Sequence, residues 1–184
     1  MEVNRFDSFN QYCGPAVLSI FTGARTDDCA EEIQKINGKH KITGVFASDL
    51  IAAGERMGLE FKENQAFQWR SIYWAGTVMA RLADAQYLVT IPKHFIAMEV
   101  RAGKLFICDN HTKTELELQN SARLSQKIER VWKVTKVREY SRPTVVKTEY
   151  AADLTYKNVQ VKCIQTLSDG GIKIHPLTRD ACIT

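Results

Sequence analysis

Apolar and polar positions follow two different periods along the chain, and the change falls near Tyr87. Before it, apolar residues recur at helical spacing between glycine and asparagine stop signals, which predicts helices over residues 15–22, 26–37, 49–57 and 77–84. The first helix is apolar on nearly all sides, so we expect it to be buried. Pro15 suits its first position, and Gly23 suits the left-handed residue at its end. Thr26 and Ser48 are the expected N-caps of the next two helices.

From Tyr87 onward the chain consists of short β-rich runs joined by turn residues. Three runs, 87–91, 94–100 and 104–109, predict an antiparallel meander, and another strand is expected over 128–137. After Pro143 the strand-like runs are 144–150, 157–167 and 170–177, with Gly170 and Gly171 marking a hairpin.

Helices followed by strands predict an α+β fold, with the N-terminal helices packed on an antiparallel sheet. We expect one domain over residues 1–140 and a β-rich C-terminal extension over 141–184.

The composition is that of a globular protein, with 184 residues of which 45% are hydrophobic and 25% charged. No apolar stretch approaches the ~20 residues that a membrane-spanning helix needs, and the N-terminus lacks the features of a signal peptide. We therefore expect a cytoplasmic protein with no membrane partner. The five cysteines show neither zinc-site spacing nor a disulfide framework, so reduced thiols, no metal and no cofactor are expected.

The net charge of +4 is unevenly distributed. Eight Lys or Arg and only two Glu lie between Arg123 and Lys147. One interpretation of this basic segment, 123–147, is a docking surface for an acidic partner. The other is that these cations are the solvated positions of strands whose apolar residues face inward. No nucleic-acid-binding motif accompanies the segment, so a nucleic-acid partner is not expected.

The most informative short motif places Cys13 directly before the predicted buried helix, in the segment Gln11-Tyr12-Cys13-Gly14-Pro15. Unpaired N–H groups and the positive end of the helix dipole stabilise a thiolate, which is the nucleophilic form of cysteine. Gly14 leaves room for a substrate. Cys13 is therefore the candidate nucleophile.

A thiol nucleophile needs a base, and the base needs an orienting partner. His94 opens one predicted strand, and the next strand ends in Asp109 and Asn110. With a two-residue turn at 102–103, His94 lies opposite His111 and diagonal to Asp109 on the same face. With a three-residue loop at 101–103, His94 lies opposite Asn110, which then becomes the orienting residue. Either partner would fix the ring angle and tautomer of His94.

Other reactive or aromatic side chains have simpler interpretations. Cys29 is expected in the core, and Cys108 should face away from Asp109 because side chains alternate along a strand. We interpret His111 as a loop residue. The aromatic group is expected to form core or groove wall rather than a binding platform, and it comprises Trp69, Tyr73 and Trp74.

The motif CGPA before an apolar helix, followed later by HFIA and GKLFICDN, resembles the papain-like cysteine peptidases. The similarity is greatest to bacteriocin-leader-peptidase-like domains and their phage-encoded relatives, and it covers roughly residues 8–137. It implies a papain-like fold, a phage or bacterial source, a protein or peptide substrate, and a triad of Cys13, His94 and Asp109. These enzymes also carry a glutamine several residues before the cysteine, which helps to form the oxyanion hole. Here Asp7 stands six positions before Cys13.

Gln11 and Asn10 are the nearest amides that could replace that glutamine, and spacing does not choose between them. The leading hypothesis is a cysteine peptidase that cleaves a peptide or isopeptide bond through a thioester intermediate. An alternative keeps the triad but performs deamidation, transglutamination or other acyl transfer. The missing upstream glutamine motivates a third hypothesis, an inactive papain-like module that binds a host or virion protein.

Overall fold

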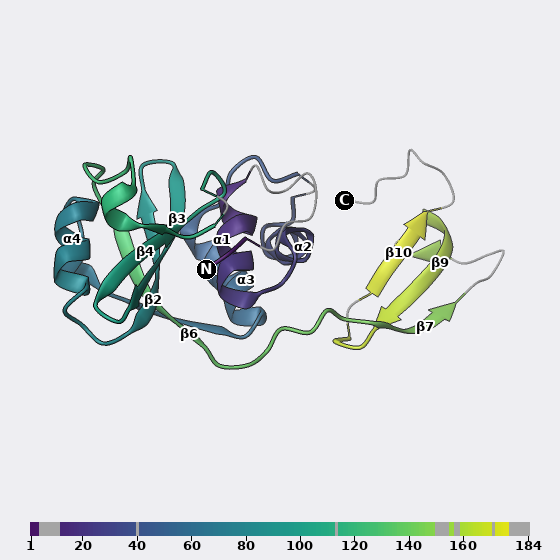
Figure 1. Ribbon diagram of the computed structural model, residues 1–184. Coiled ribbons are helices and arrows are strands. Elements are labelled where there is room, and N and C mark those ends of the chain that lie inside the picture. Colours follow the sequence, from purple (N-terminus) through teal and green to yellow (C-terminus); the bar gives the residue numbers. More distant parts are fainter. Residues whose placement is uncertain are drawn as a thin grey trace. The chain divides into compact units, whose positions relative to one another are not determined.

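The chain folds into two compact units, Met1–Tyr140 and Ser141–Thr184, in a computed structural model (Figure 1). The structure describes residues 1–3, 12–39, 41–112, 114–149, 155–156, 159–170 and 172–176. Within these ranges, no helix is long and apolar enough to cross a membrane.

The first unit is α+β, as predicted, and is built on a six-stranded antiparallel sheet with strand order β1-β6-β2-β3-β4-β5. The strands are β1 (Leu59–Glu63), β2 (Ala85–Ile91), β3 (His94–Arg101), β4 (Lys104–Cys108), β5 (Leu116–Glu117) and β6 (Arg130–Lys136). The predicted meander is confirmed as β2-β3-β4. The later strand β6 pairs with the other side of β2, and β1 lies beyond it at the edge.

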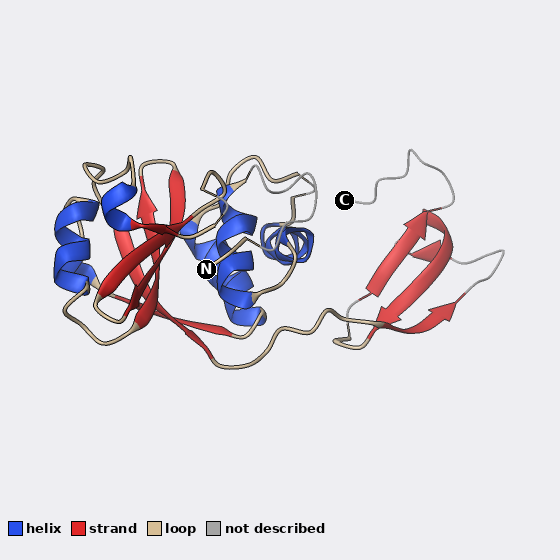
Figure 2. Ribbon diagram, viewed as in Figure 1, coloured by secondary structure: helices blue, strands red, loops and turns tan. Residues whose placement is uncertain are grey.

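Helices cover both faces of this sheet (Figure 2). One face carries α1 (Cys13–Thr22), α2 (Thr26–Asn37) and α3 (Ala47–Arg56). The opposite face carries α4 (Ile72–Met79) and the short 3₁₀ turns η2 (Gln65–Phe67) and η3 (Leu118–Asn120). Each face therefore has its own hydrophobic core.

Alternation along the central strands supplies both cores. In β3, Phe95 and Ala97 face the α1–α3 side, whereas Ile96 and Met98 face the α4 side. A strand with both faces covered needs apolar residues at successive positions, which explains the continuous apolar run HFIAMEV.

The first two helices match the sequence closely. α1 begins at Cys13, two residues earlier than predicted, and ends at Gly23, whose φ of 75° and N–H bond to the Ser19 carbonyl confirm the expected left-handed cap. α2 spans the predicted residues, but its N-cap is Arg25, and Thr26 is already helical. α3 likewise begins at Ala47, so Ser48 lies inside its first turn instead of capping it.

The fourth predicted helix was wrong by about one turn. Instead of 77–84, α4 spans Ile72–Met79, where the Ser71 side chain caps it by accepting a hydrogen bond from the Trp74 N–H at 3.3 Å. Of the two expectations for the nearby aromatic residues, core or groove wall, the core one was wrong, whereas Tyr73 does line a surface pocket. Trp69, Tyr73 and Trp74 are 64%, 61% and 43% exposed. They lie on the outer side of this segment because its inward positions are taken by Ile72, Ala75 and Met79.

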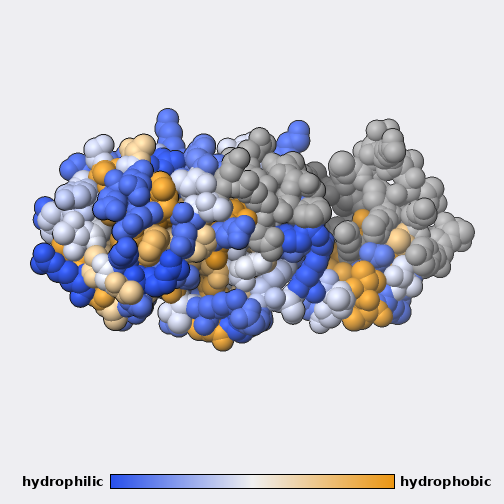
Figure 3. Space-filling view, in the orientation of Figure 1, coloured by the Kyte–Doolittle hydropathy of each residue, from blue (hydrophilic) through white to orange (hydrophobic). Residues whose placement is uncertain are grey.

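The second unit is a small antiparallel sheet of order β10-β9-β7, with β8 also paired to β9. Its strands are β7 (Val145–Glu149), β8 (Thr155–Tyr156), β9 (Val159–Leu167) and β10 (Ile172–Pro176). Apolar side chains reach its surface, as Figure 3 shows, and they include Val146 at 61% and Ile172 at 54% exposed.

Candidate active site

Cys13 is the first residue of α1, and every other residue of this helix is buried. The helix is therefore held firmly, and its N-terminus presents main-chain N–H groups and a partial positive charge next to the thiol. Gly14 is close-packed, because a Cβ there would lie 3.0 Å from Val45 Cγ2. The position of Cys13 is thus fixed by the buried helix α1.

The turn at 102–103 is the two-residue alternative. Arg101 pairs with Lys104, and Ala102 and Gly103 adopt φ values of 50° and 72°. Tight hairpins favour two successive residues with positive φ, because their twist matches that of the strands. In this register His94 falls opposite His111, and their ring centroids lie 5.4 Å apart.

This register brings His94 to Asp109, not to Asn110. The His94 Nε2 and Asp109 Oδ2 atoms are 2.8 Å apart. Asp109 comes directly after β4, and its side chain shares the face of His94, as the strand alternation requires. The contact occupies Nε2 of the imidazole and leaves Nδ1 for a second interaction.

Asp109 is 2% exposed, and its carboxylate is fixed by main-chain donors. Its Oδ1 atom accepts hydrogen bonds from the N–H groups of His111 at 2.9 Å and Thr112 at 2.8 Å. In return, the Asp109 N–H donates to the Thr112 hydroxyl at 3.0 Å. Burial raises the pKa of Asp109, but the hydrogen bonds from His94 and Thr112, the charge of Arg123 and the His111 N–H together hold that pKa well below its usual range.

The thiol and the imidazole form the second link of the site. Burial raises the pKa of Cys13, but hydrogen bonds with His94 and the Phe95 N–H outweigh burial, so the pKa of Cys13 lies below its ordinary value. Burial lowers the pKa of His94, whereas hydrogen bonds to Asp109 and Cys13 raise it to a net value of about 8. A lowered thiol pKa beside a raised imidazole pKa favours a thiolate–imidazolium pair.

Arg123 is a further site residue, and from the sequence it was predicted only as part of the basic segment. Its Nη2 atom lies 2.8 Å from Asp109 Oδ2 and 3.3 Å from His94 Nε2. No local motif marks this arginine, because the contact depends on the path of the loop before β6.

The two candidate oxyanion residues, Gln11 and Asn10, lie outside the described residues. The main-chain N–H groups of Cys13 and Gly14 stand in the first turn of α1, where the helix's own hydrogen-bond ladder does not use them. They can serve as donors to a negatively charged oxygen near the sulfur.

The other described cysteines have buried thiols, and Cys13, Cys29, Cys108 and Cys163 are all free. Burial, which the Thr22 contact only partly offsets, holds the pKa of Cys29 far above its ordinary range. Burial also raises the pKa of Cys108 to about 11. Cys108 packs in the core on the α1–α3 side, away from Asp109, as its place on the strand requires. Of these four thiols, Cys13 alone combines partial exposure with a lowered pKa.

The basic segment 123–147 crosses the boundary between the two units at Tyr140. Several of its cations have acidic partners within their own unit, among them Arg123 with Asp109, Arg130 with Glu63, Lys136 with Glu139 and Lys147 with Glu149. An acidic docking partner for the segment stays a prediction.

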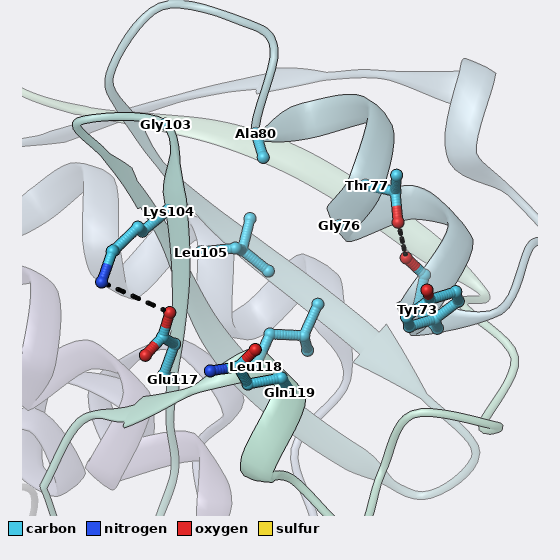
Figure 4. Close-up of a pocket in the computed structure, with 10 residues that line it drawn as sticks. All are labelled: Tyr73, Gly76, Thr77, Ala80, Gly103, Lys104, Leu105, Glu117, Leu118 and Gln119. Carbon is cyan, nitrogen blue, oxygen red and sulfur yellow. Dashed lines mark hydrogen bonds and ion pairs between the residues drawn. The ribbon is translucent and has the colours of Figure 1, made fainter.

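A surface pocket of about 190 Å³ lies at the other end of the β3–β4 hairpin from His94. Its walls come from α4, the turn at Gly103 and η3 (Figure 4). An ion pair between Lys104 and Glu117, 3.7 Å apart, crosses one side, and Leu105 and Leu118 lie in the pocket. The pocket does not include Cys13. Among the described residues, no cluster of three or more His, Cys, Asp or Glu side chains is placed to hold a metal ion.

Comparisons of the chain with protein-family models, with curated proteins and with solved structures find no match. The relationship to papain-like peptidases therefore stays a prediction from the motifs. The geometry of Cys13, His94 and Asp109 is the basis on which a function can be proposed.

Proposed function

We propose that the chain is a cysteine hydrolase that cleaves a peptide or isopeptide bond through Cys13, His94 and Asp109. The observation that carries the proposal is the 2.8 Å contact between His94 and the buried Asp109 carboxylate, on an imidazole that also holds the pKa of Cys13 below its ordinary value. A nucleophile, a base and an orienting group in this order are the parts that acyl transfer requires.

Each part has a defined step. His94 takes the proton of the Cys13 thiol, and the sulfur attacks the carbonyl carbon of the substrate. The carbonyl electrons move onto oxygen, where the N–H groups at the start of α1 stabilise the charge. When the tetrahedral intermediate collapses, the C–N bond breaks and His94 gives its proton to the leaving amine, which leaves a thioester on Cys13. Water, deprotonated by His94, then attacks the thioester carbonyl. The C–S bond breaks, the acid is released, and the proton on His94 returns to the Cys13 sulfur.

Asp109 supports both proton transfers. It holds Nε2 of His94 at 2.8 Å and favours the charged imidazolium that forms when the thiol ionises. Because the carboxylate is itself fixed by the His111 and Thr112 N–H groups, the imidazole ring cannot rotate freely away from Cys13.

The first test is selective labelling with iodoacetamide near pH 7, read by mass spectrometry of the tryptic peptides. Cys13 should react faster than free cysteine, because its lowered pKa makes a larger fraction of the thiol ionised at this pH. Cys29 and Cys108 are internal controls that should remain unlabelled while the protein is folded. Labelling of Cys13 no faster than free cysteine would contradict the proposal.

The second test incubates the protein with a peptide library and compares it with the variants Cys13→Ala and His94→Ala. We expect new peptide termini in the wild-type digest and a loss of at least about a hundredfold in each variant. Fragments identify backbone cleavage, whereas a gain of one dalton without cleavage identifies the deamidation that the same triad could perform. Variants with unchanged cleavage would overturn the assignment of the triad.

A further inference from the structure

We infer that Arg123 is a positioning residue of the triad, which holds the Asp109 carboxylate in place and restrains the positive charge on His94. This inference rests on the proposed function, because it assigns a role within the same site. It concerns a residue that contacts the base and its orienting group, not the substrate.

The geometry places two donors on one oxygen. Arg123 Nη2 and His94 Nε2 each lie 2.8 Å from Asp109 Oδ2, and they are 3.3 Å from each other. The Asp109 side chain is 2% exposed and that of Arg123 is 21% exposed, so water screens this contact less than it screens a surface ion pair. Among the described residues, the Asp109 carboxylate has four donors: Arg123 and His94 on Oδ2, and the main-chain N–H groups of His111 and Thr112 on Oδ1.

The loop that carries Arg123 is held in place by main-chain hydrogen bonds. The Arg123 N–H donates to the Ser121 hydroxyl at 3.1 Å, and its carbonyl accepts from the Gln126 N–H at 3.0 Å. The next residue, Leu124, accepts a hydrogen bond from the Tyr73 N–H at the start of α4, also at 3.0 Å. The guanidinium is thus delivered to Asp109 from a loop tied to a neighbouring helix, as a supporting residue must be.

Among the residues that the structure describes, four ionisable groups face His94: Cys13 from α1, Asp109 and His111 from the turn after β4, and Arg123 from the loop before β6. Asp109 and Cys13 favour the imidazolium, and the positive charge of Arg123 opposes it. A general acid works best when its pKa is near the working pH. Without Arg123, His94 would hold its proton more firmly and pass it less readily to a leaving amine.

The test compares Arg123→Gln, Arg123→Lys and the control Arg130→Gln by NMR titration of the histidine ring ¹³Cε1–¹H signals, with His94 assigned from a His94→Gln variant. Arg130 is a matched control because its ion pair with Glu63 joins β6 to β1, at the opposite edge of the sheet from β5. Removal of a positive charge this close should raise the His94 midpoint, by up to about one pH unit, above the value of about 8 that we expect for the wild type. Arg123→Lys, which keeps the charge, should bring it back toward the wild type, and Arg130→Gln should not move it.

A His94 midpoint in Arg123→Gln that is unchanged or lower would overturn the inference. A second measurement needs no variant at that position: in the wild type, the Arg123 ¹³Cζ signal should shift with the His94 midpoint, and a signal that stays constant through that titration would also overturn it. Iodoacetamide labelling separates this inference from the proposed function. If Cys13 is labelled selectively but the His94 midpoint does not move in Arg123→Gln, only the role of Arg123 is overturned. If the midpoint moves but Cys13 is not labelled selectively, the coupling between Arg123 and His94 is supported and the proposed hydrolase function is overturned.

Discussion

Replacement of Asp109 by Asn tests the electrostatic basis of the proposed triad with a minimal change in shape. The Asn Oδ1 atom can still accept the hydrogen bonds from the His111 and Thr112 N–H groups, so the turn after β4 keeps its anchor. The second position changes from an acceptor oxygen to an NH₂ donor, which faces the donors on His94 and Arg123. The imidazolium then loses its carboxylate while the guanidinium remains.

The expected magnitude follows from the raised pKa of His94. That value, about 8, lies above the ordinary 6.5, although burial and Arg123 both act to lower it. Without the carboxylate, the pKa of His94 should fall to 6.5 or below, a change of about 1.5 units or about 2 kcal/mol. At pH 7 the ratio of charged to neutral His94 would drop by roughly thirtyfold.

Two measurements check this result. The His94 ring signal should titrate at or below pH 6.5 in Asp109→Asn, and iodoacetamide should label Cys13 more slowly at pH 7 because the thiolate has lost its charged partner. Asp49→Asn is the control, since this carboxylate lies in the first turn of α3 and has an exposed hydrogen bond from the Ser48 hydroxyl. An Asp109→Asn protein that is folded by tryptophan fluorescence but still titrates at about pH 8 would refute the reasoning.

Two further predictions concern stability, and both can be followed by tryptophan fluorescence during guanidinium unfolding, because all three tryptophans precede residue 140. Gly58→Ala should destabilise the first unit by about 1–3 kcal/mol more than Gly23→Ala. Both glycines have positive φ, but of the two only Gly58 is so placed that a Cβ would meet a main-chain atom, the Arg138 carbonyl oxygen at 2.6 Å. Equal losses of stability in the two variants would contradict the clash. In Cys13→Ala the contact with Asp109 still raises the pKa of His94, but the contribution of the thiol is gone. His94 therefore contributes stability that is complete below about pH 6.5, is lost as pH rises through the native pKa, and is smaller than the about 2 kcal/mol that a pKa of about 8 would give. A Cys13→Ala/His94→Gln double variant provides the reference, and a stability difference between the two that is independent of pH would disprove the linkage.

The sequence was most informative where function and local turn chemistry coincide. The turn residues before Lys104 predicted two possible strand registers. The structure has the one with a two-residue turn at Ala102 and Gly103, and this register brings His94 to Asp109. Gly23 marked the end of α1 because a left-handed residue is needed there. In both cases the deciding interactions lie within a few residues of one another.

The misplaced and missed features depend on distant partners. β1 was not predicted as a strand, because its pairing with β6 joins Leu59 to Lys136, far along the chain. α4 was misplaced because its aromatic first turn resembles a strand, while its inner side is held by packing in the second core. Arg123 was missed for the same reason, since only the folded loop brings it to Asp109.

The sheet with two cores has a consequence for control of the proposed nucleophile. Cys13 belongs to a helix that packs on one face, whereas His94 and Asp109 are fixed to the strands themselves. The distance between the Cys13 sulfur and the His94 imidazole therefore depends on the position of α1 relative to β3. A displacement of ~1 Å at such a contact can lower the reaction rate by about a hundredfold. A molecule that shifts this helix slightly would separate the Cys13 thiol from its base and lower its reactivity, while every hydrogen bond of Asp109 stays intact.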